Sequence, residues 1–254
     1  MKVRVLGSGT SSGVPRIGND WGACDPADPR NARTRASILV ETDTTRILVD
    51  TGPDMRAQLL AARVGTVDAV IWTHDHADHT HGIDDLRQVY HELGHPVRGF
   101  ARPWTATTLT TRFPYVFAGA GGYPPTATME HLADSLIVGD IAIGVVDQPH
   151  GAITSAGLRF EADGRSLGYA TDIKAMTEDA ERLYSNLDVW IVDALRERVH
   201  PSHAELATTL GWIETLKPRR AVLTHMDQSL DYGTLAGRLP RGVEPGYDGL
   251  EITL

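Results

Sequence analysis

A buried strand that runs directly into a cluster of histidines is the feature that most constrains this fold. The apolar segment 69–73 is followed by four potential metal ligands within six residues, namely His74, His76, Asp78 and His79. Alternate side chains of an extended segment point the same way, so His74 and His76 can bind one ion. Where the chain then turns into a helix, Asp78 and His79 can face a second ion. A solvated polar loop is the competing interpretation, and four ligands at this spacing argue against it.

Three later residues of the same chemical kind also follow predicted strands. His150, Asp172 and His225 each come after an apolar segment, and ligands of α/β proteins gather at the ends of strands. A single histidine in such a place is more often structural than a ligand, but three such residues in succession strengthen the metal hypothesis. Imidazole and carboxylate suit zinc, manganese or iron, and no thiolate lies near the cluster to favour a softer metal.

The order of the apolar segments predicts a layered α/β sandwich with two related halves. We predict strands at 3–6, 37–41, 46–49, 69–73, 141–145, 158–162, 166–170, 189–192, 221–223 and 250–254, and helices at 54–63, 83–93, 174–183 and 203–215. The length of 254 residues fits a single domain that spans residues 1–254. The segment at about 98–125 lacks a clear period, and we expect it to be an insertion that forms a lid or a dimer element.

The acidic composition limits the partners that the chain can take. A formal net charge of −9 disfavours binding to nucleic acid, although bound cations would still allow a small anionic substrate. No window approaches the roughly 20 apolar residues that a membrane helix needs, and the N-terminal apolar stretch is too short for a signal peptide. The only cysteine, Cys24, cannot form an intramolecular disulfide, which agrees with a reducing compartment. We therefore expect a cytoplasmic protein without a membrane partner.

The segment from His74 to His79 resembles the H-x-H-x-D-H signature of the metallo-β-lactamase superfamily, and the later candidate ligands follow in the order expected there. The resemblance extends over the whole chain and implies the four-layer αβ/βα sandwich of that fold. It also implies two divalent metal ions, zinc or manganese, with iron as a further choice. The implied ligands are His74, His76 and His150 for one ion, Asp78, His79 and His225 for the other, and Asp172 as the bridge.

Several residues narrow the branch of the superfamily. Asp172 stands where the true β-lactamases have cysteine, and His76 stands where flavodiiron oxygen reductases have glutamate. The glycine-rich opening 7–15 resembles the phosphodiesterase branch, which includes tRNase Z and PhnP, the cyclic-phosphate phosphodiesterase of phosphonate breakdown. Segments 31–37 and 79–87 are more similar to PhnP. The resemblance implies that hydroxide bridging two metals cleaves a small cyclic or nucleotide-like phosphodiester.

Two histidines before a predicted helix are candidates for the general acid. In the PhnP and tRNase Z branch a histidine at this point acts as general acid or stabilises the transition state. We prefer His203, which we expect to open the helix, and keep His200 in reserve. Asp78 is a further candidate to orient the attacking water, besides being a ligand. The carboxylates expected to orient the ligand histidines are Asp50, Asp75 and Asp193.

One part of the sequence departs from the PhnP pattern. PhnP-type relatives often hold a second, structural zinc with an N-terminal cysteine cluster and a late histidine. Here only Cys24 remains of the cysteines, and Gln228 stands three positions after His225. A structural zinc needs four good ligands, so we expect this ion to be absent and Cys24 to be structural or incidental.

Three other functions remain open. The same metals could serve a thioester hydrolase of the glyoxalase II type, although the glycine-rich turn and His203 argue against it. An RNA 3′-processing endonuclease usually carries a Gly- and Lys-rich arm, whereas segment 98–125 has no lysine. A non-catalytic metal-binding protein is disfavoured because all seven ligand positions are filled. We expect a small phosphodiester as the partner, and a homodimer by resemblance only.

Overall fold

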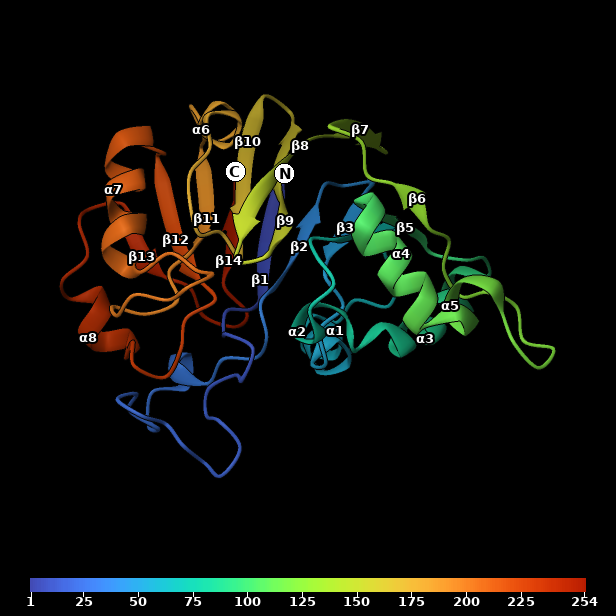
Figure 1. The fold of residues 1–254 in the computed structure, drawn as a ribbon, viewed down its shortest axis with the longest axis horizontal. Helices are drawn as coiled ribbons and strands as arrows, with labels where there is room; N and C mark the ends of the chain where they lie inside the picture. The colour runs from blue at the N-terminus through green and yellow to red at the C-terminus, as the bar shows by residue number, and fades with distance from the viewer.

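Two seven-stranded sheets form the centre of the computed structural model, which describes residues 1–254 (Figure 1). The first sheet has the order β14-β1-β2-β3-β4-β5-β6 and the second has the order β13-β12-β11-β10-β9-β8-β7. The first contains β1 (Lys2–Gly7), β2 (Ser37–Glu41), β3 (Arg46–Val49), β4 (Ala69–Trp72), β5 (Arg98–Ala101), β6 (Glu130–His131) and β14 (Glu251–Thr253). The second contains β7 (Ser135–Val138), β8 (Ile141–His150), β9 (Ile153–Ala162), β10 (Arg165–Ala170), β11 (Val189–Asp193), β12 (Arg220–Thr224) and β13 (Val243–Pro245).

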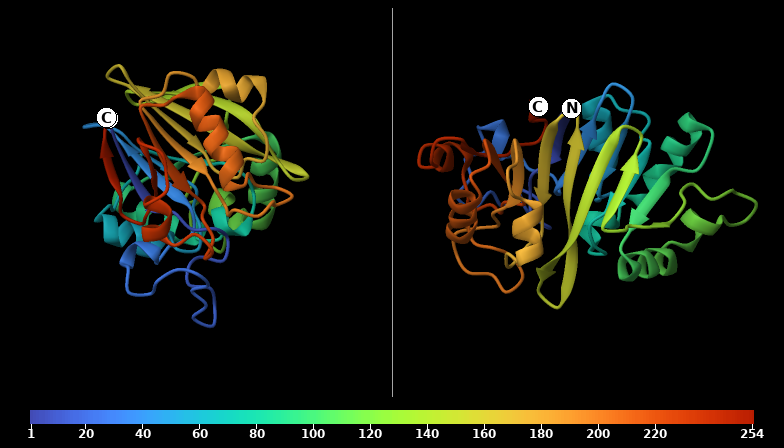
Figure 2. Two further views of the ribbon diagram at one scale, coloured as in Figure 1. Left: turned by 90° about the vertical axis from the view of Figure 1, so that its left-hand side faces the viewer. Right: turned by 90° about the horizontal axis from the view of Figure 1, so that it is seen from above.

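Helices cover the outer faces of both sheets. They are η1 (Pro29–Asn31), α1 (Met55–Ala62), α2 (Ala77–Thr80), η2 (Ile83–Asp85), α3 (Leu86–Leu93), α4 (Pro103–Arg112), α5 (Pro114–Ala118), α6 (Glu178–Leu183), α7 (Leu206–Leu216) and α8 (Tyr232–Ala236). None of them is long and apolar enough to cross a bilayer. Figure 2 shows the sheets stacked on each other, with the two termini side by side on β1 and β14, which pair antiparallel.

The alternation of side chains along the strands produces three buried layers. In β2, Ile38 and Val40 point into the core between the two sheets, whereas Leu39 points to the helices outside the first sheet. The central core joins both sheets, for example through Val3 and Phe160. Each sheet also packs its outer face against its own helices. The predicted four-layer αβ/βα sandwich is therefore confirmed.

Segment 98–125 is more regular than its sequence pattern indicates, and its role as a lid or dimer element stays a prediction. This segment supplies β5, an inner strand that pairs with β4 and β6, and then the helices α4 and α5. Ala101, Leu109 and Val116 are buried in the core outside the first sheet. The sequence pattern failed here because the elements are short, and because Pro103 and Pro114 each restart a helix at its first turn.

Two predicted helices begin later than expected. The helix predicted from residue 174 begins at Glu178, because the Thr177 side chain accepts a hydrogen bond from Ala180 N and caps it there. The helix predicted from His203 begins at Leu206. His203 therefore lies in the preceding loop and does not open the helix. Both loops follow parallel strands of the second sheet, at the edge where the candidate site lies.

Candidate metal centre

The loop after β4 is held in place by one buried carboxylate. Asp50 lies directly after β3 and accepts hydrogen bonds from Thr73 N (2.8 Å) and Thr73 Oγ1 (2.9 Å). Its Oδ2 also lies 2.7 Å from Nδ1 of His79. Asp50 has a φ of 67°, a left-handed conformation that a non-glycine residue adopts only when its surroundings hold it. Asp50 therefore fixes both ends of the His74–His79 segment, as the prediction of an orienting role for it requires.

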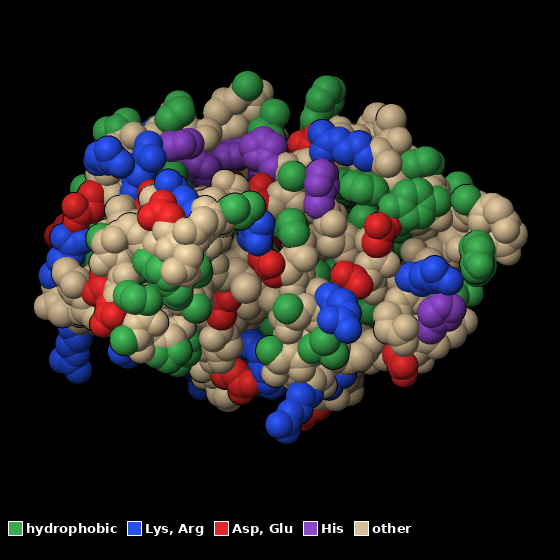
Figure 3. Space-filling view, turned by 90° about the horizontal axis from the view of Figure 1, so that it is seen from below, with side chains coloured by type: hydrophobic (Ala, Val, Ile, Leu, Met, Phe, Trp, Pro, Cys, Tyr) green, Lys and Arg blue, Asp and Glu red, His purple; other side chains and the backbone are tan.

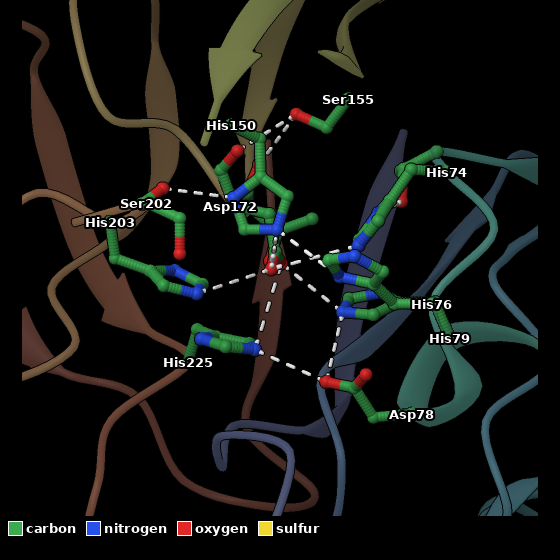
Figure 4. A network of polar contacts seen from close by, with 12 residues as sticks. His74, His76, Asp78, His79, His150, Ser155, Asp172, Ser202, His203 and His225 are labelled. Carbon is green, nitrogen blue, oxygen red and sulfur yellow. Dashed lines mark hydrogen bonds and ion pairs between the residues drawn. The ribbon is translucent and has the colours of Figure 1, made fainter. Parts of the chain in front are cut away.

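The seven predicted ligands converge on one place between the edges of the two sheets (Figure 4). They form two groups, one of His74, His76, His150 and Asp172, and one of Asp78, His79 and His225. Only His76 is exposed, so the site opens to solvent on its side. Figure 3 shows histidine side chains gathered in a hollow on one face of the molecule.

Asp172 lies between the two groups and turns one oxygen toward each. Its Oδ1 is 3.4 Å from His150 Nε2 and 3.8 Å from His74 Nε2. Its Oδ2 is 3.1 Å from His79 Nε2 and 3.6 Å from His225 Nε2. This is the arrangement that a carboxylate bridging two cations requires.

The donor atoms fit bound cations. Nε2 of His74, His79 and His225 is buried and has no hydrogen-bond partner, and such orphaned groups are costly unless a ligand satisfies them. His76 Nδ1 and His150 Nε2 face each other at 3.2 Å. Nitrogen and carboxylate donors without thiolate suit borderline or hard divalent ions. The cluster is thus a metal-binding His/Asp site, and which residue holds which ion stays a prediction.

The local charges set the protonation states that a metal would meet. Burial lowers the pKa of His74 and of His150, which keeps both rings neutral and able to donate a lone pair. Burial also lowers the pKa of His225, but Asp172, Asp78 and Asp193 outweigh it and raise the value to about 9. Without a metal this ring carries a proton that a cation would have to displace.

In His74, His79 and His150 the second ring nitrogen is held by the protein, whereas His225 Nδ1 is buried without a hydrogen-bond partner. His150 Nδ1 lies 2.9 Å from the carbonyl oxygen of Ser202, and His74 Nδ1 lies 3.0 Å from Thr73 Oγ1. Such contacts fix the tautomer and the orientation of a ligand ring. No sequence pattern marks Ser202, because any residue offers a carbonyl oxygen.

The predicted orienting role of Asp75 is wrong. Its carboxylate and its carbonyl oxygen both accept hydrogen bonds from Arg112 of α4. In an extended segment Asp75 points opposite to its neighbours His74 and His76, so it turns away from the ligands. It connects the ligand loop to α4.

His203 is the better oriented of the two candidate acids. Its Nδ1 lies 2.7 Å from Asp193 Oδ2, and its Nε2 points to Asp172 Oδ1 at 3.7 Å. The ring stacks on His225 with centroids 4.8 Å apart. His200 is less buried than His203. Its ring centroid lies 5.0 Å from that of His203, and its Nδ1 is directed to Ser202. His203, Asp172 and His225 also form a third group close enough to hold an ion.

The glycine-rich turn after β1 lies beside His225. Met226 N donates to Ser8 O, and Thr10 N donates to Met226 O. A Cβ on Gly7 would lie 2.0 Å from the carbonyl oxygen of Arg35, so only glycine allows this close approach. Further along the turn, after Thr10, the backbone amides of Ser11 and Ser12 donate no hydrogen bond within the protein.

A distant carboxylate, which the sequence did not reveal, anchors this turn. Asp248 accepts hydrogen bonds from the amides and the hydroxyls of Ser8 and Thr34. Burial raises the pKa of Asp248 to about 6, although these donors act in the opposite direction. The residue lies more than 200 positions from both partners, and no local pattern connects them.

The region around Cys24 is held by a buried guanidinium. Arg33 donates hydrogen bonds to the carbonyl oxygens of Asp227 and Leu230, just after His225. Cys24 is buried beside it, and its Sγ donates to the carbonyl oxygen of Gln228. These contacts tie the N-terminal loop to the segment that carries His225.

Comparison with known proteins agrees with this geometry. Residues 45–226 match the family model described as a β-lactamase superfamily domain. The structure superimposes on a diphosphatase from the PhnP family with a TM-score of 0.91 and 32% identity, covering 99% of this chain and 96% of that one. It also matches Zn²⁺-bound PqqB from Methylobacterium extorquens with a TM-score of 0.83 and 19% identity over 100% of both chains, a likeness of fold. An octanoyltransferase of Porphyromonas gingivalis is 32% identical over the whole chain, which spans 52% of that relative's length.

The chain therefore belongs to the β-lactamase superfamily, and it combines the metallo-β-lactamase fold with a metal-binding His/Asp cluster. Within the superfamily it is PhnP-like.

Proposed function

We propose that the protein is a metal-dependent phosphodiesterase that cleaves a small cyclic or nucleotide-like phosphodiester. The observation that carries the proposal is the pair of His203 and Asp193. The imidazole is held by a buried carboxylate at 2.7 Å and directs Nε2 toward the bridging position of Asp172. A leaving alkoxide needs a proton donor at this point, and a neutral thiol leaving group needs it far less.

Each part of the site has its own role in the proposed reaction. Two divalent cations bound by the cluster would activate a water and offset the charge of the phosphoryl oxygens. His203 donates the proton from Nε2 to the leaving oxygen, and Asp193 stabilises the imidazolium before that transfer. The free amides of Ser11 and Ser12 lie on the turn beside His225 and can donate to a second anionic group of the substrate.

The likeness to a diphosphatase adds diphosphates to the substrates that we propose. In a phosphodiester and in a diphosphate that links two organic groups, the attacked phosphorus carries two bridging oxygens and one negative charge. The same site can therefore accept either. The octanoyltransferase of Porphyromonas gingivalis is about twice as long as this chain, so its name does not support acyl transfer here.

A substrate panel tests the proposal. The protein loaded with zinc or manganese is assayed with bis(p-nitrophenyl) phosphate, a ribose cyclic phosphate, a dinucleoside diphosphate, a glutathione thioester and a precursor tRNA. We expect turnover of the small phosphorus substrates, a loss in His203→Ala with the ribose cyclic phosphate, whose leaving group is an alkoxide, and no loss in His95→Ala, an exposed histidine just after α3. Turnover of the thioester alone, or of the tRNA alone, would refute the proposal.

A further inference from the structure

A second cavity lies apart from the metal centre, between α3, α5 and the loop that follows α5. Its volume is about 540 Å³, within the range of small-molecule sites. It shares no residue with the metal-binding groups. The side chains that give it its chemistry are Asp84, Arg87, Tyr90, His91, Tyr115 and Tyr123. We call it the aromatic cavity.

One cation of the aromatic cavity has no acidic partner. The Arg87 guanidinium makes no ion pair and no hydrogen bond, and lies 5.1 Å from the centroid of the Tyr123 ring. This is within the distance at which a cation is attracted to an aromatic face. The nearest acid of the lining, Asp84, already accepts a hydrogen bond from the Tyr115 hydroxyl. The cavity therefore places the Arg87 cation next to aromatic rings, while the Asp84 carboxylate, the acid of the lining, is directed to the Tyr115 hydroxyl and makes no ion pair with Arg87.

Two of the rings are left unusually exposed. Tyr123 is 67% exposed and Tyr115 is 43% exposed, and both face the same cavity. Large apolar side chains that line a hollow in this way commonly mark a binding site. Figure 3 shows hydrophobic side chains gathered beyond the histidines on the same face as the metal site.

The loop that carries Tyr123 ends in a tight turn at the rim of the cavity. Ala120 and Tyr123 close a tight turn through two backbone hydrogen bonds. The intervening Gly121 and Gly122 have left-handed φ values of 58° and 88°, and a Cβ on either would meet nothing within 4 Å. The turn thus projects into solvent, anchored where Thr126 N donates to Val116 O. Tyr123 is therefore held at the rim of the cavity by a turn that stands clear of the core.

We propose that the aromatic cavity binds a planar aromatic molecule that carries a negative charge. The ring would stack against Tyr123, and the anionic group would pair with Arg87. A free aromatic acid and the distant aromatic part of a substrate share this chemistry. The proposal does not depend on the phosphodiesterase function.

Titration with 8-anilinonaphthalene-1-sulfonate, which combines fused rings with a sulfonate, tests the proposal by fluorescence. We expect one site per chain, and about tenfold weaker binding in both Arg87→Met and Tyr123→Ala. Tyr123→Phe keeps the ring and should retain the affinity. Matched controls are Arg56→Met, an exposed arginine on α1, and Trp104→Ala, an exposed aromatic outside the cavity. Circular dichroism establishes that each variant is folded.

Unchanged affinity in both cavity variants, or an equal loss in the controls, would overturn the proposal. So would a dimer that Tyr123→Ala converts to a monomer while the dye fails to bind, because the cavity would then be an interface between copies. A second arm separates the two sources of ligand by measuring phosphodiester turnover with saturating dye. A raised KM with unchanged kcat assigns the cavity to the substrate's own ring, and unchanged KM assigns it to a separate ligand.

Discussion

Replacing Asp193 by asparagine removes the charge that faces His203 and keeps the shape of the side chain. Asp193 is fully buried, and its Oδ2 lies 2.7 Å from His203 Nδ1. A charged hydrogen bond of this kind contributes about 1.5–3 kcal/mol, which is about 10- to 150-fold in rate. The amide oxygen of asparagine can still accept from Nδ1. We therefore expect the kcat of Asp193→Asn to fall by about 10- to 50-fold, in the lower part of that range.

The assay compares two leaving groups and a double variant. An alkyl leaving group needs the proton from His203, so His203→Ala should slow it about 100-fold or more, whereas p-nitrophenolate leaves with little help. If Asp193 acts through His203, the double variant should be no slower than His203→Ala alone. The metal content of each variant is measured as well, because Asp193 Oδ1 also lies 4.0 Å from His225 Nδ1. Fully additive losses, or equal losses for both leaving groups, would refute the assignment of His203 as general acid.

Three further predictions concern the metal centre. Asp50→Ala should weaken metal binding about 10- to 100-fold, measured by competition with a chromogenic chelator. In Gly52→Ala the new Cβ would lie 2.3 Å from the carbonyl oxygen of Asp78, so the metal content should drop, whereas Gly65→Ala, with open space around it, should keep full metal content. The metal-free protein should gain stability from protonated His225 below its unfolded pKa near 6.5 and lose it as pH rises through about 9. Metal uptake at pH 7 should therefore release protons, which calorimetry in two buffers of different ionisation enthalpy measures; equal heats would contradict this.

The parts of the fold that depend on local chemistry were predictable. The hairpin of β2 and β3 has the predicted bounds, because two short runs of consecutive apolar residues and the polar turn between them define it within thirteen residues. The His74–His79 motif indicated a metal site, and the resemblance to the metallo-β-lactamase superfamily added His150, Asp172 and His225, which the structure brings together with the motif.

The parts that depend on contacts between distant segments were not predictable. Asp193 was expected to orient a histidine, but the sequence could not tell that its partner is His203, ten residues later. The alternation of an extended segment already directs Asp75 away from His74 and His76, but its partner, Arg112 of α4, lies 37 residues later, and no sequence pattern connects the two. Asp248 reaches the glycine-rich turn from the far end of the chain, where no pattern marks it.

Metal titration of the activity tests the central claim most directly. Metal-free protein receives manganese or zinc in steps while hydrolysis of bis(p-nitrophenyl) phosphate is followed and bound metal is counted. The bridging position of Asp172 between two groups of ligands predicts that activity develops fully only at about two ions per chain. Full activity at one ion per chain, or a plateau of bound metal below about two ions, would contradict a two-metal site.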